Sequence, residues 1–257
     1  MAIDMHVHLS VAPDGKVLCG PEGLLSIMDK NAVSGSVMMS LMGLFSNFTD
    51  HKTENTAIAE FCKKAPGRFY PSFTVNPLSS EEAVDEVKRC VNELNVKILK
   101  LHPWLQGFSI TYEQMDKVAE VCQELGVTIL FHDGTPPYAT PLQEARLARE
   151  YPELKIVSGH SGLNDLWTDA VLAAKRYPNY YLSFCGSTTG QMQQIVDQIP
   201  PEQICVGSDL ILGAKMDFCD DEDAMWFRWQ AWRKVKVSDE AREIIENQTA
   251  KKLLNIK

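Results

Sequence analysis

The stretch Ile3-Asp-Met-His-Val-His-Leu9 is a short apolar run with two histidines, and seven further apolar, β-branched runs follow it. Their starts are separated by 24 to 35 residues along the whole chain. Runs of this length and composition, spaced in this way, are typical of buried parallel strands. The eight predicted strands are 3–9, 34–41, 69–76, 96–103, 127–134, 155–162, 180–186 and 204–211.

The segments between these runs have the periodicity of amphipathic helices. In residues 80–91, for example, Val84, Val87 and Val91 fall on one helical face. Strand and helix alternate eight times, which predicts a parallel sheet with right-handed crossovers. Eight units of about 30 residues favour a closed (β/α)8 TIM barrel. An open doubly wound sheet is the alternative, but no glycine-rich phosphate turn follows the first run. We therefore predict a single α/β domain over residues 1–257.

Composition narrows the class of protein. The chain has 257 residues, of which 45% are hydrophobic and 23% charged, as in ordinary globular proteins. The net charge of −9 argues against a nucleic-acid binder, and no apolar run is long enough to predict a membrane span. The seven cysteines are odd in number and form no CxxC motif, and the first residues lack a basic signal region. We expect a cytoplasmic protein whose cysteines are buried thiols.

Histidines gather at the predicted strand ends. Because alternate strand residues share a face, His6 and His8 point the same way. The carboxyl ends of barrel strands form one rim, where active sites lie. Imidazoles and a carboxylate at such a rim predict a catalytic divalent-metal site with an open position. The residues that we expect to meet there are His6, His8, His102, His132, His160 and Asp209. His51 lies in the loop after the second run, and we interpret it as structural.

Several of these segments resemble the amidohydrolase superfamily. They are Asp4-Met5-His6-Val7-His8, Phe131-His132, Gly159-His160-Ser161-Gly162 and Gly207-Ser208-Asp209. Residues 66–69, 99–108 and 247–254 are similar to the amidohydrolase-related branch, which includes aminocarboxymuconate-semialdehyde decarboxylase. The resemblance covers essentially the whole chain and is more specific for the metal site than for the substrate.

The resemblance implies a role for each of these residues. His6, His8 and His132 would bind one divalent ion, with zinc expected and manganese as an alternative, and Asp209 would complete the shell and carry protons. His160 would orient or deprotonate the water at the metal, or coordinate the ion itself.

Three residues near the fourth run have open interpretations. Lys100 resembles the carboxylated lysine that bridges two metals in binuclear members of the superfamily. The resemblance to the amidohydrolase-related branch instead implies one metal and an unmodified lysine. His102, on the same strand face, either binds substrate or holds the following loop. Trp104 lines the mouth of the site together with Tyr138 and Trp167, or these aromatics pack in a lid or against helices.

We expect a metal-dependent hydrolase in which a metal-activated water attacks a small amide, lactone or similar carbonyl substrate. The alternative is a metal-dependent non-oxidative decarboxylase of a small aromatic or unsaturated carboxylic acid. No arginine directly follows a predicted strand, which favours hydrolysis, whereas Lys100 and Lys215 could hold a carboxylate. A non-catalytic metal-binding relative is a third possibility, which activity with added metal would exclude.

Two segments near the end of the barrel have structural interpretations. The hydroxyl residues 187–189 are predicted to cap a helix rather than to bind substrate. The acidic residues 220–223 are typical of a solvated helix start. The aromatic residues that follow favour either a homodimer interface or a cover of the core; they are Trp226, Phe227, Trp229 and Trp232.

Overall fold

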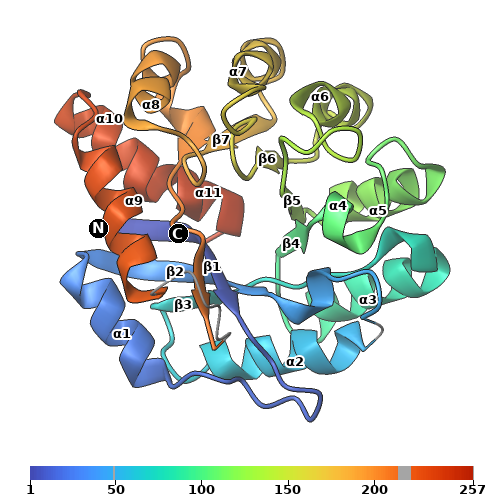
Figure 1. Ribbon diagram of the computed structural model, residues 1–257. Helices are drawn as coiled ribbons and strands as arrows, with labels where there is room; N and C mark the ends of the chain where they lie inside the picture. Colours follow the sequence, from blue (N-terminus) through green and yellow to red (C-terminus); the bar gives the residue numbers. More distant parts are fainter. Residues whose placement is uncertain (49, 214–220, 257) are drawn as a thin grey trace.

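Parallel strands lie at the centre of the computed structural model, and helices surround them as a ring (Figure 1). The structure describes residues 1–48, 50–213 and 221–256. The strands are β1 (Ala2–Leu9), β2 (Val33–Ser40), β3 (Phe69–Pro71), β4 (Ile98–Leu101), β5 (Thr128–Phe131), β6 (Ile156–Ser158), β7 (Tyr180–Ser183), β8 (Ile204–Cys205) and β9 (Leu210–Leu212).

The strands pair in two parallel sheets, in the orders β3-β2-β1-β9 and β4-β5-β6-β7-β8. Backbone hydrogen bonds of flanking residues join the sheets at both seams. The Lys100 N–H donates to the Phe73 carbonyl (2.9 Å), and the Met5 N–H donates to the Val206 carbonyl (2.9 Å). The strands therefore follow one another in chain order around a (β/α)8 barrel, as the spacing of the runs predicts.

Helices connect successive strands on the outside of the barrel (Figure 1). The α-helices are α1 (Pro21–Lys30), α2 (His51–Cys62), α3 (Glu81–Asn92), α4 (Pro103–Gln106), α5 (Glu113–Glu124), α6 (Pro141–Glu150), α7 (Trp167–Arg176), α8 (Thr189–Val196), α9 (Asp221–Arg233), α10 (Asp239–Glu243) and α11 (Thr249–Leu254). Short 3-10 turns lie at Met42–Leu44 (η1), Pro77–Ser79 (η2) and Pro201–Gln203 (η3), and a π-helical turn, η4, at Ile244–Gln248.

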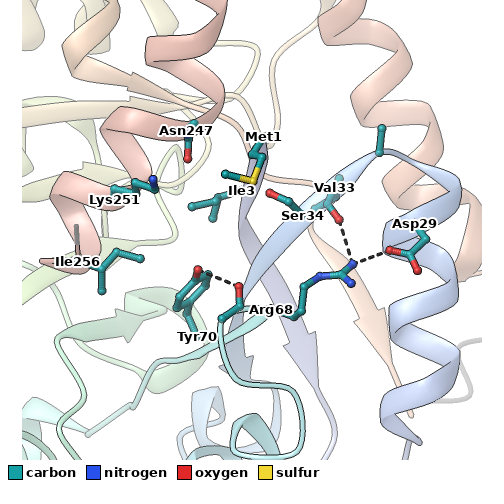
Figure 2. Close-up of a pocket in the computed structure, with 12 residues that line it drawn as sticks. Met1, Ile3, Asp29, Val33, Ser34, Arg68, Tyr70, Asn247, Lys251 and Ile256 are labelled. Carbon is teal, nitrogen blue, oxygen red and sulfur yellow. Dashed lines mark hydrogen bonds and ion pairs between the residues drawn. The ribbon is translucent and has the colours of Figure 1, made fainter.

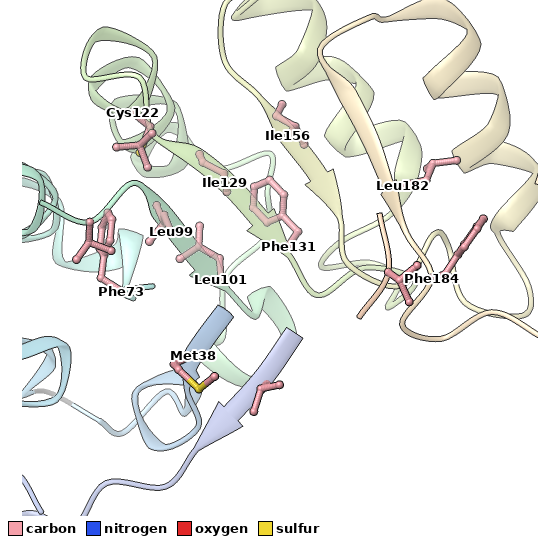
Figure 3. Packing of buried hydrophobic residues seen from close by; sticks show 14 of the residues in the cluster. Met38, Phe73, Leu99, Leu101, Cys122, Ile129, Phe131, Ile156, Leu182 and Phe184 are labelled. Carbon is pink, nitrogen blue, oxygen red and sulfur yellow. The ribbon is translucent and has the colours of Figure 1, made fainter. Parts of the chain in front are cut away.

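Two apolar cores hold the barrel together. The larger core lies between the strands and the helices, where Leu99, Ile129 and Leu182 pack outward (Figure 3). The smaller core fills the barrel interior with one or two side chains from most strands and includes Leu253 of α11. The Thr128 hydroxyl donates to the Leu253 carbonyl (2.8 Å), so α11 closes the amino end of the barrel. The opposite end stays free for polar side chains.

The predicted strands agree with the structure in number and order. Each of the eight runs contains a strand, and the last run contains β8 and the start of β9, separated by the turn that carries Asp209. Strand ends differ by several residues because the last residues of most runs have left the sheet and form the rim.

The remaining structural predictions have mixed outcomes. Thr188 caps α8, with its hydroxyl accepting the Gln191 N–H (3.3 Å), so the capping interpretation is confirmed. On α9, Trp229 and Trp232 are buried in the core, whereas Trp226 and Phe227 are exposed. Lys215 and the first acidic residue of the run 220–223 lie outside the described residues. Within the described chain, no helix is long and apolar enough to cross a membrane.

Candidate metal centre

The two histidines of β1 point into the barrel because the strand is irregular. Ile3 and Met5 belong to the interior core, so strict alternation would turn His6 outward. The register of β1 against β2 shifts between Asp4 and Val7, and Val7 instead packs in the outer core. A bulge of this kind re-aims the side chains that follow it. The bulge thus brings both imidazoles to the carboxyl end of the barrel interior.

The donor atoms of this pair already have the spacing of metal ligands. The Nε2 atoms of His6 and His8 lie 3.1 Å apart, and each lies 3.5 Å from Oδ1 of Asp209. Donors at about 2.0–2.2 Å from one ion, at angles of 90–109°, are separated by about 3.0–3.5 Å. The Nδ1–H of His8 donates to the Ser40 carbonyl (2.7 Å), which leaves Nε2 with its lone pair for an ion.

Asp209 is placed by a tight turn between β8 and β9. Its backbone is left-handed (φ +60°), and its N–H donates to the His6 carbonyl (2.9 Å). Its side chain is 39% exposed, so the carboxylate lies beside the histidine pair and is also accessible from the open end of the barrel. Burial raises the pKa of Asp209, but the neighbouring His6 and His8 lower it further, so its pKa lies well below the usual range.

Three further imidazoles continue from this pair across the barrel mouth. The ring of His160 lies 5.3 Å from that of His6, and the ring of His132 lies 4.3 Å from His160. His102 stacks on His132 with ring centroids 3.7 Å apart and planes at 10°. The structure therefore gathers all five rim histidines and Asp209, as the sequence predicts; which of them bind an ion stays a prediction.

Cys185 joins the site, which sequence reasoning missed. One donor atom each from His6, His160, Cys185 and Asp209 lies within 4.8 Å of the other three. Cys185 lies two residues after the end of β7, so the rule that located the histidines at strand ends applies to it too. We interpreted every cysteine as a buried apolar thiol, and for the other five described cysteines that interpretation fits, since all are free and all but Cys19 are buried.

Buried polar atoms without partners also point to a bound cation. Within the described chain, His6 Nδ1 and His160 Nε2 are buried and have no hydrogen-bond partner. Burial lowers the pKa of His6 and of His160, and it lowers the pKa of Lys100 to about 8. Neutral imidazole is the form that binds metals. The residues present therefore fit a divalent ion.

Buried carboxylates anchor the loops that carry these ligands. Oδ1 of Asp4 accepts the N–H groups of His6 (2.9 Å) and Ser208 (3.0 Å), and Oδ2 accepts the Trp229 indole N–H (2.9 Å). Burial raises the pKa of Asp4 to about 6. Asp133 similarly accepts the His160 N–H (2.6 Å). Sequence reasoning missed both roles, although each residue lies within two positions of a predicted ligand.

The site opens into a largely apolar pocket of about 430 Å³. Its described lining contains no lysine or arginine. It combines three histidines and a carboxylate with six apolar side chains: His8, His102, His132 and Asp209, and Leu41, Met42, Leu44, Phe45, Leu105 and Ile211. Trp104, on α4, is 54% exposed and does not belong to this lining, although its ring lies 6.2 Å from that of His102. Trp167 packs against the outer core, which supports its packing interpretation.

His102 serves the loop and also faces the pocket. The ring Nδ1 of His102 accepts the Leu105 N–H (3.4 Å), and the backbone N–H of His102 donates to Oε1 of Gln106 (2.8 Å). Burial lowers its pKa to about 2, so the ring is neutral and its proton lies on Nε2. His51 lies apart from the site and donates from Nε2 to the Gly43 carbonyl (3.1 Å), which confirms the structural interpretation.

A larger hollow of about 650 Å³ lies at the opposite, amino end of the barrel (Figure 2). Its residues include Ile3, Arg68, Tyr70 and Lys251. Arg68 donates to Asp29 (2.6 Å) and to the Val33 carbonyl (3.4 Å). The described lining contains neither histidine nor cysteine, so this hollow has none of the nitrogen or sulfur donors of the rim.

Comparison with known proteins gives one family and many similar folds. A family model described as Amidohydrolase matches residues 3–256. A search of curated proteins finds no match. Among solved structures, a 2,6-dihydroxybenzoate decarboxylase from Rhizobium is 16% identical, with a TM-score of 0.75 and coverage of 99% of this chain and 98% of that chain.

Two further solved structures resemble this fold to a similar degree. A 5-carboxyvanillate decarboxylase from Sphingomonas paucimobilis is 15% identical, with a TM-score of 0.75 and coverage of 100% and 99% of the two chains. A dihydroxybenzoic acid decarboxylase from Polaromonas sp. JS666, with bound manganese and the inhibitor 2-nitroresorcinol, is 18% identical, with a TM-score of 0.72 and coverage of 99% and 96%. At this identity the likeness establishes the fold.

Proposed function

Since the chain belongs to the amidohydrolase family, we propose that it is a metal-dependent decarboxylase of a small aromatic or unsaturated carboxylic acid. The observation that carries the proposal is the pocket itself. Its lining combines three imidazoles and one carboxylate with six apolar side chains. Such a pocket suits a flat, apolar body whose polar groups all lie at one end.

The metal would be held by His6, His8 and Asp209, whose donor atoms lie 3.1–3.5 Å apart. His132 is proposed as a further donor from the strand-5 side. A divalent ion bound there would supply positive charge for the carboxylate and a neighbouring oxygen of the substrate. The manganese in the Polaromonas decarboxylase supports a divalent ion, and zinc remains our proposal for this chain.

Asp209 is the residue that we assign to proton transfer. Its Oδ1 faces the two imidazoles of β1, so Oδ2 is the atom proposed to move the proton. It accepts a proton from a substrate hydroxyl and delivers it to the carbon that bears the carboxylate. The C–C bond then breaks, its electron pair returns to the unsaturated system, and CO2 leaves. No electrons are gained or lost, so the step needs no redox partner.

The other side chains would orient the substrate. The stacked rings of His102 and His132 form a flat wall, and the Nε2–H of His102 is a donor for a substrate oxygen. Leu41, Phe45 and Ile211 line the apolar part of the pocket and would exclude water from the reacting carbon. Exclusion of water favours loss of CO2 over hydrolysis, which requires water at the same place.

A metal-dependent hydrolase is the second candidate, because the described pocket lining has no lysine or arginine for a substrate carboxylate. The three decarboxylases of similar fold support the first candidate. Lys100 is buried beside the ligands and its Nζ has no partner among the described residues, so it could balance an added negative charge.

A substrate screen separates the two candidates. The protein, loaded in turn with Zn²⁺ and Mn²⁺, is incubated with hydroxybenzoic acids and with matched esters, lactones and amides. We expect CO2 and a decarboxylated phenol from at least one acid, and no product after chelation. Hydrolysis of an ester, lactone or amide, with every acid left intact, would contradict the proposal.

A further inference from the structure

We infer that Cys185 is a thiolate ligand of the metal and that it gives this chain a preference for Zn²⁺ over Mn²⁺. The inference rests on the metal site of the proposed function, and it adds a ligand from the β7 side of the barrel. The motifs that identify the family lie on strands 1, 5, 6 and 8, so they give no reason to expect it.

Geometry places the sulfur in the ligand cluster. The donor atoms of Cys185, His6, His160 and Asp209 all lie within 4.8 Å of one another. Ligands of one tetrahedral ion are about 3.3–3.8 Å apart for bonds of about 2.0–2.3 Å, so a small inward movement of these atoms would complete the site. Cys185 is 1% exposed, so its sulfur is shielded from solvent within this group of donor atoms.

A second, independent observation concerns His160. The residue is only 3% exposed, and its Nε2 has no partner among the described residues. A buried imidazole nitrogen without a partner is costly unless it binds something. Its ring reaches this place because Gly186, the residue after Cys185, lacks a side chain: a Cβ there would lie 3.2 Å from His160 Nδ1 and 3.1 Å from His160 Cβ. The β7 loop therefore supplies the sulfur and the space for the histidine together.

The chemistry of sulfur gives the direction of the preference. Thiolates favour Zn²⁺, Co²⁺ and other softer ions, whereas Mn²⁺ prefers oxygen ligands. Binding exchanges the S–H bond for a sulfur–metal bond and releases the proton to the buffer. The oxidation state of the sulfur does not change.

Cobalt provides a direct readout that does not depend on a substrate. We titrate the full-length protein with Co²⁺ and record the near-ultraviolet absorption, where a thiolate bound to Co²⁺ gives a charge-transfer band. The variants are Cys185→Ser and Cys185→Ala, with Cys205→Ser as the matched control, because Cys205 is also a buried thiol of the barrel interior. Zn²⁺ and Mn²⁺ affinities are measured by chelator competition on the same samples.

We expect the band in the wild-type protein and in Cys205→Ser, and its loss in both Cys185 variants. Zn²⁺ affinity should fall at least about tenfold in Cys185→Ser, with a smaller change for Mn²⁺. Stoichiometric Co²⁺ binding by the wild-type protein without the band would overturn the inference alone, even if neither variant folds. Persistence of the band in the Cys185 variants would do the same. Failure to bind Co²⁺ at all would overturn the inference and the metal-dependent function together.

Discussion

The hollows at the two ends of the barrel differ in size and in chemistry, and the larger hollow is not the one that carries the candidate metal site. The hollow at the amino end is the larger, about 650 Å³ against about 430 Å³ at the carboxyl end. At the amino end, the cation Arg68 pairs with Asp29, and α11 closes the interior with apolar side chains. Among the described residues, buried polar atoms without a partner occur at both ends: Arg68 Nε and Asn247 Oδ1 at the amino end, and His6 Nδ1 and His160 Nε2 at the carboxyl end. Those at the carboxyl end lie within a cluster of imidazoles.

This difference indicates that clustered metal-binding donor atoms mark a candidate site better than volume does. A cluster of buried nitrogen donors without partners is destabilising unless a ligand completes it. Stability arises at the amino end of a barrel and function at the carboxyl end. Mutations at the two ends should therefore have separable effects.

The largest effect is expected at the histidine pair of β1. His6→Ala or His8→Ala removes a nitrogen that lies 3.1 Å from the other imidazole, and the pair no longer holds the ion. Because His6 and His8 hold the ion together from one strand, metal content should fall to a small fraction of the wild-type value, and activity should be lost with it. Elemental analysis and turnover are measured on the same preparations. A variant that keeps stoichiometric metal would show that the ion lies elsewhere.

Asp209→Asn should separate metal binding from chemistry. The amide oxygen can still coordinate weakly beside the histidines, but it cannot carry the proton. We expect most of the metal to remain while turnover falls by about 10²–10⁴-fold. Asp29→Asn, at the amino end, is the matched control and should retain full activity. Near-normal turnover of a metal-loaded Asp209→Asn protein would refute the proton-transfer role.

The two ends should also respond oppositely to pH. Burial raises the pKa of Glu54, which lies behind the pocket loop, to about 7. The protonated carboxyl group of Glu54 therefore stabilises the fold fully below about pH 4.5, and this contribution is lost as pH rises through 7. At the amino end, a hydrogen bond from Asn247 lowers the pKa of Glu243, so its contribution is lost as pH falls. Glu54→Gln should therefore stabilise the fold at pH 8, by up to about 3 kcal/mol, and much less at pH 5.

Chemical denaturation of wild type and Glu54→Gln at both pH values measures this difference. An equal effect of the substitution at pH 5 and pH 8 would mean that Glu54 does not titrate in this range. Glu243→Gln serves as the comparison from the other end, and its effect should have the opposite pH dependence.

The smallest effect is expected from Arg68→Ala. This change removes the ion pair with the exposed Asp29 and a contact to the Val33 carbonyl, and such partly exposed pairs contribute about 0–1 kcal/mol. Metal content and turnover should stay at wild-type values, with only a small shift in the unfolding midpoint. A loss of activity with normal stability would reveal a functional role for the amino-end hollow.

Local patterns predicted most of the fold and the site. The spacing of apolar runs indicated the barrel, and the position of histidines at strand ends brought five of them to one rim. The bulge of β1 was not predictable, because register depends on pairing with β2, a long-range property. Cys185 was missed because a single cysteine resembles an apolar residue in sequence, and only the fold brings His160 and His6 beside it.

The most direct test of the account is release of labelled CO2 by the metal-loaded protein. Small aromatic carboxylic acids with a ¹³C-labelled carboxyl group are incubated with wild type, with chelated wild type and with His6→Ala. The account predicts labelled CO2 from the metal-loaded wild type alone. Release that persists after chelation or in His6→Ala, or hydrolysis of a carbonyl substrate by a protein that releases no CO2 from any acid, would contradict it.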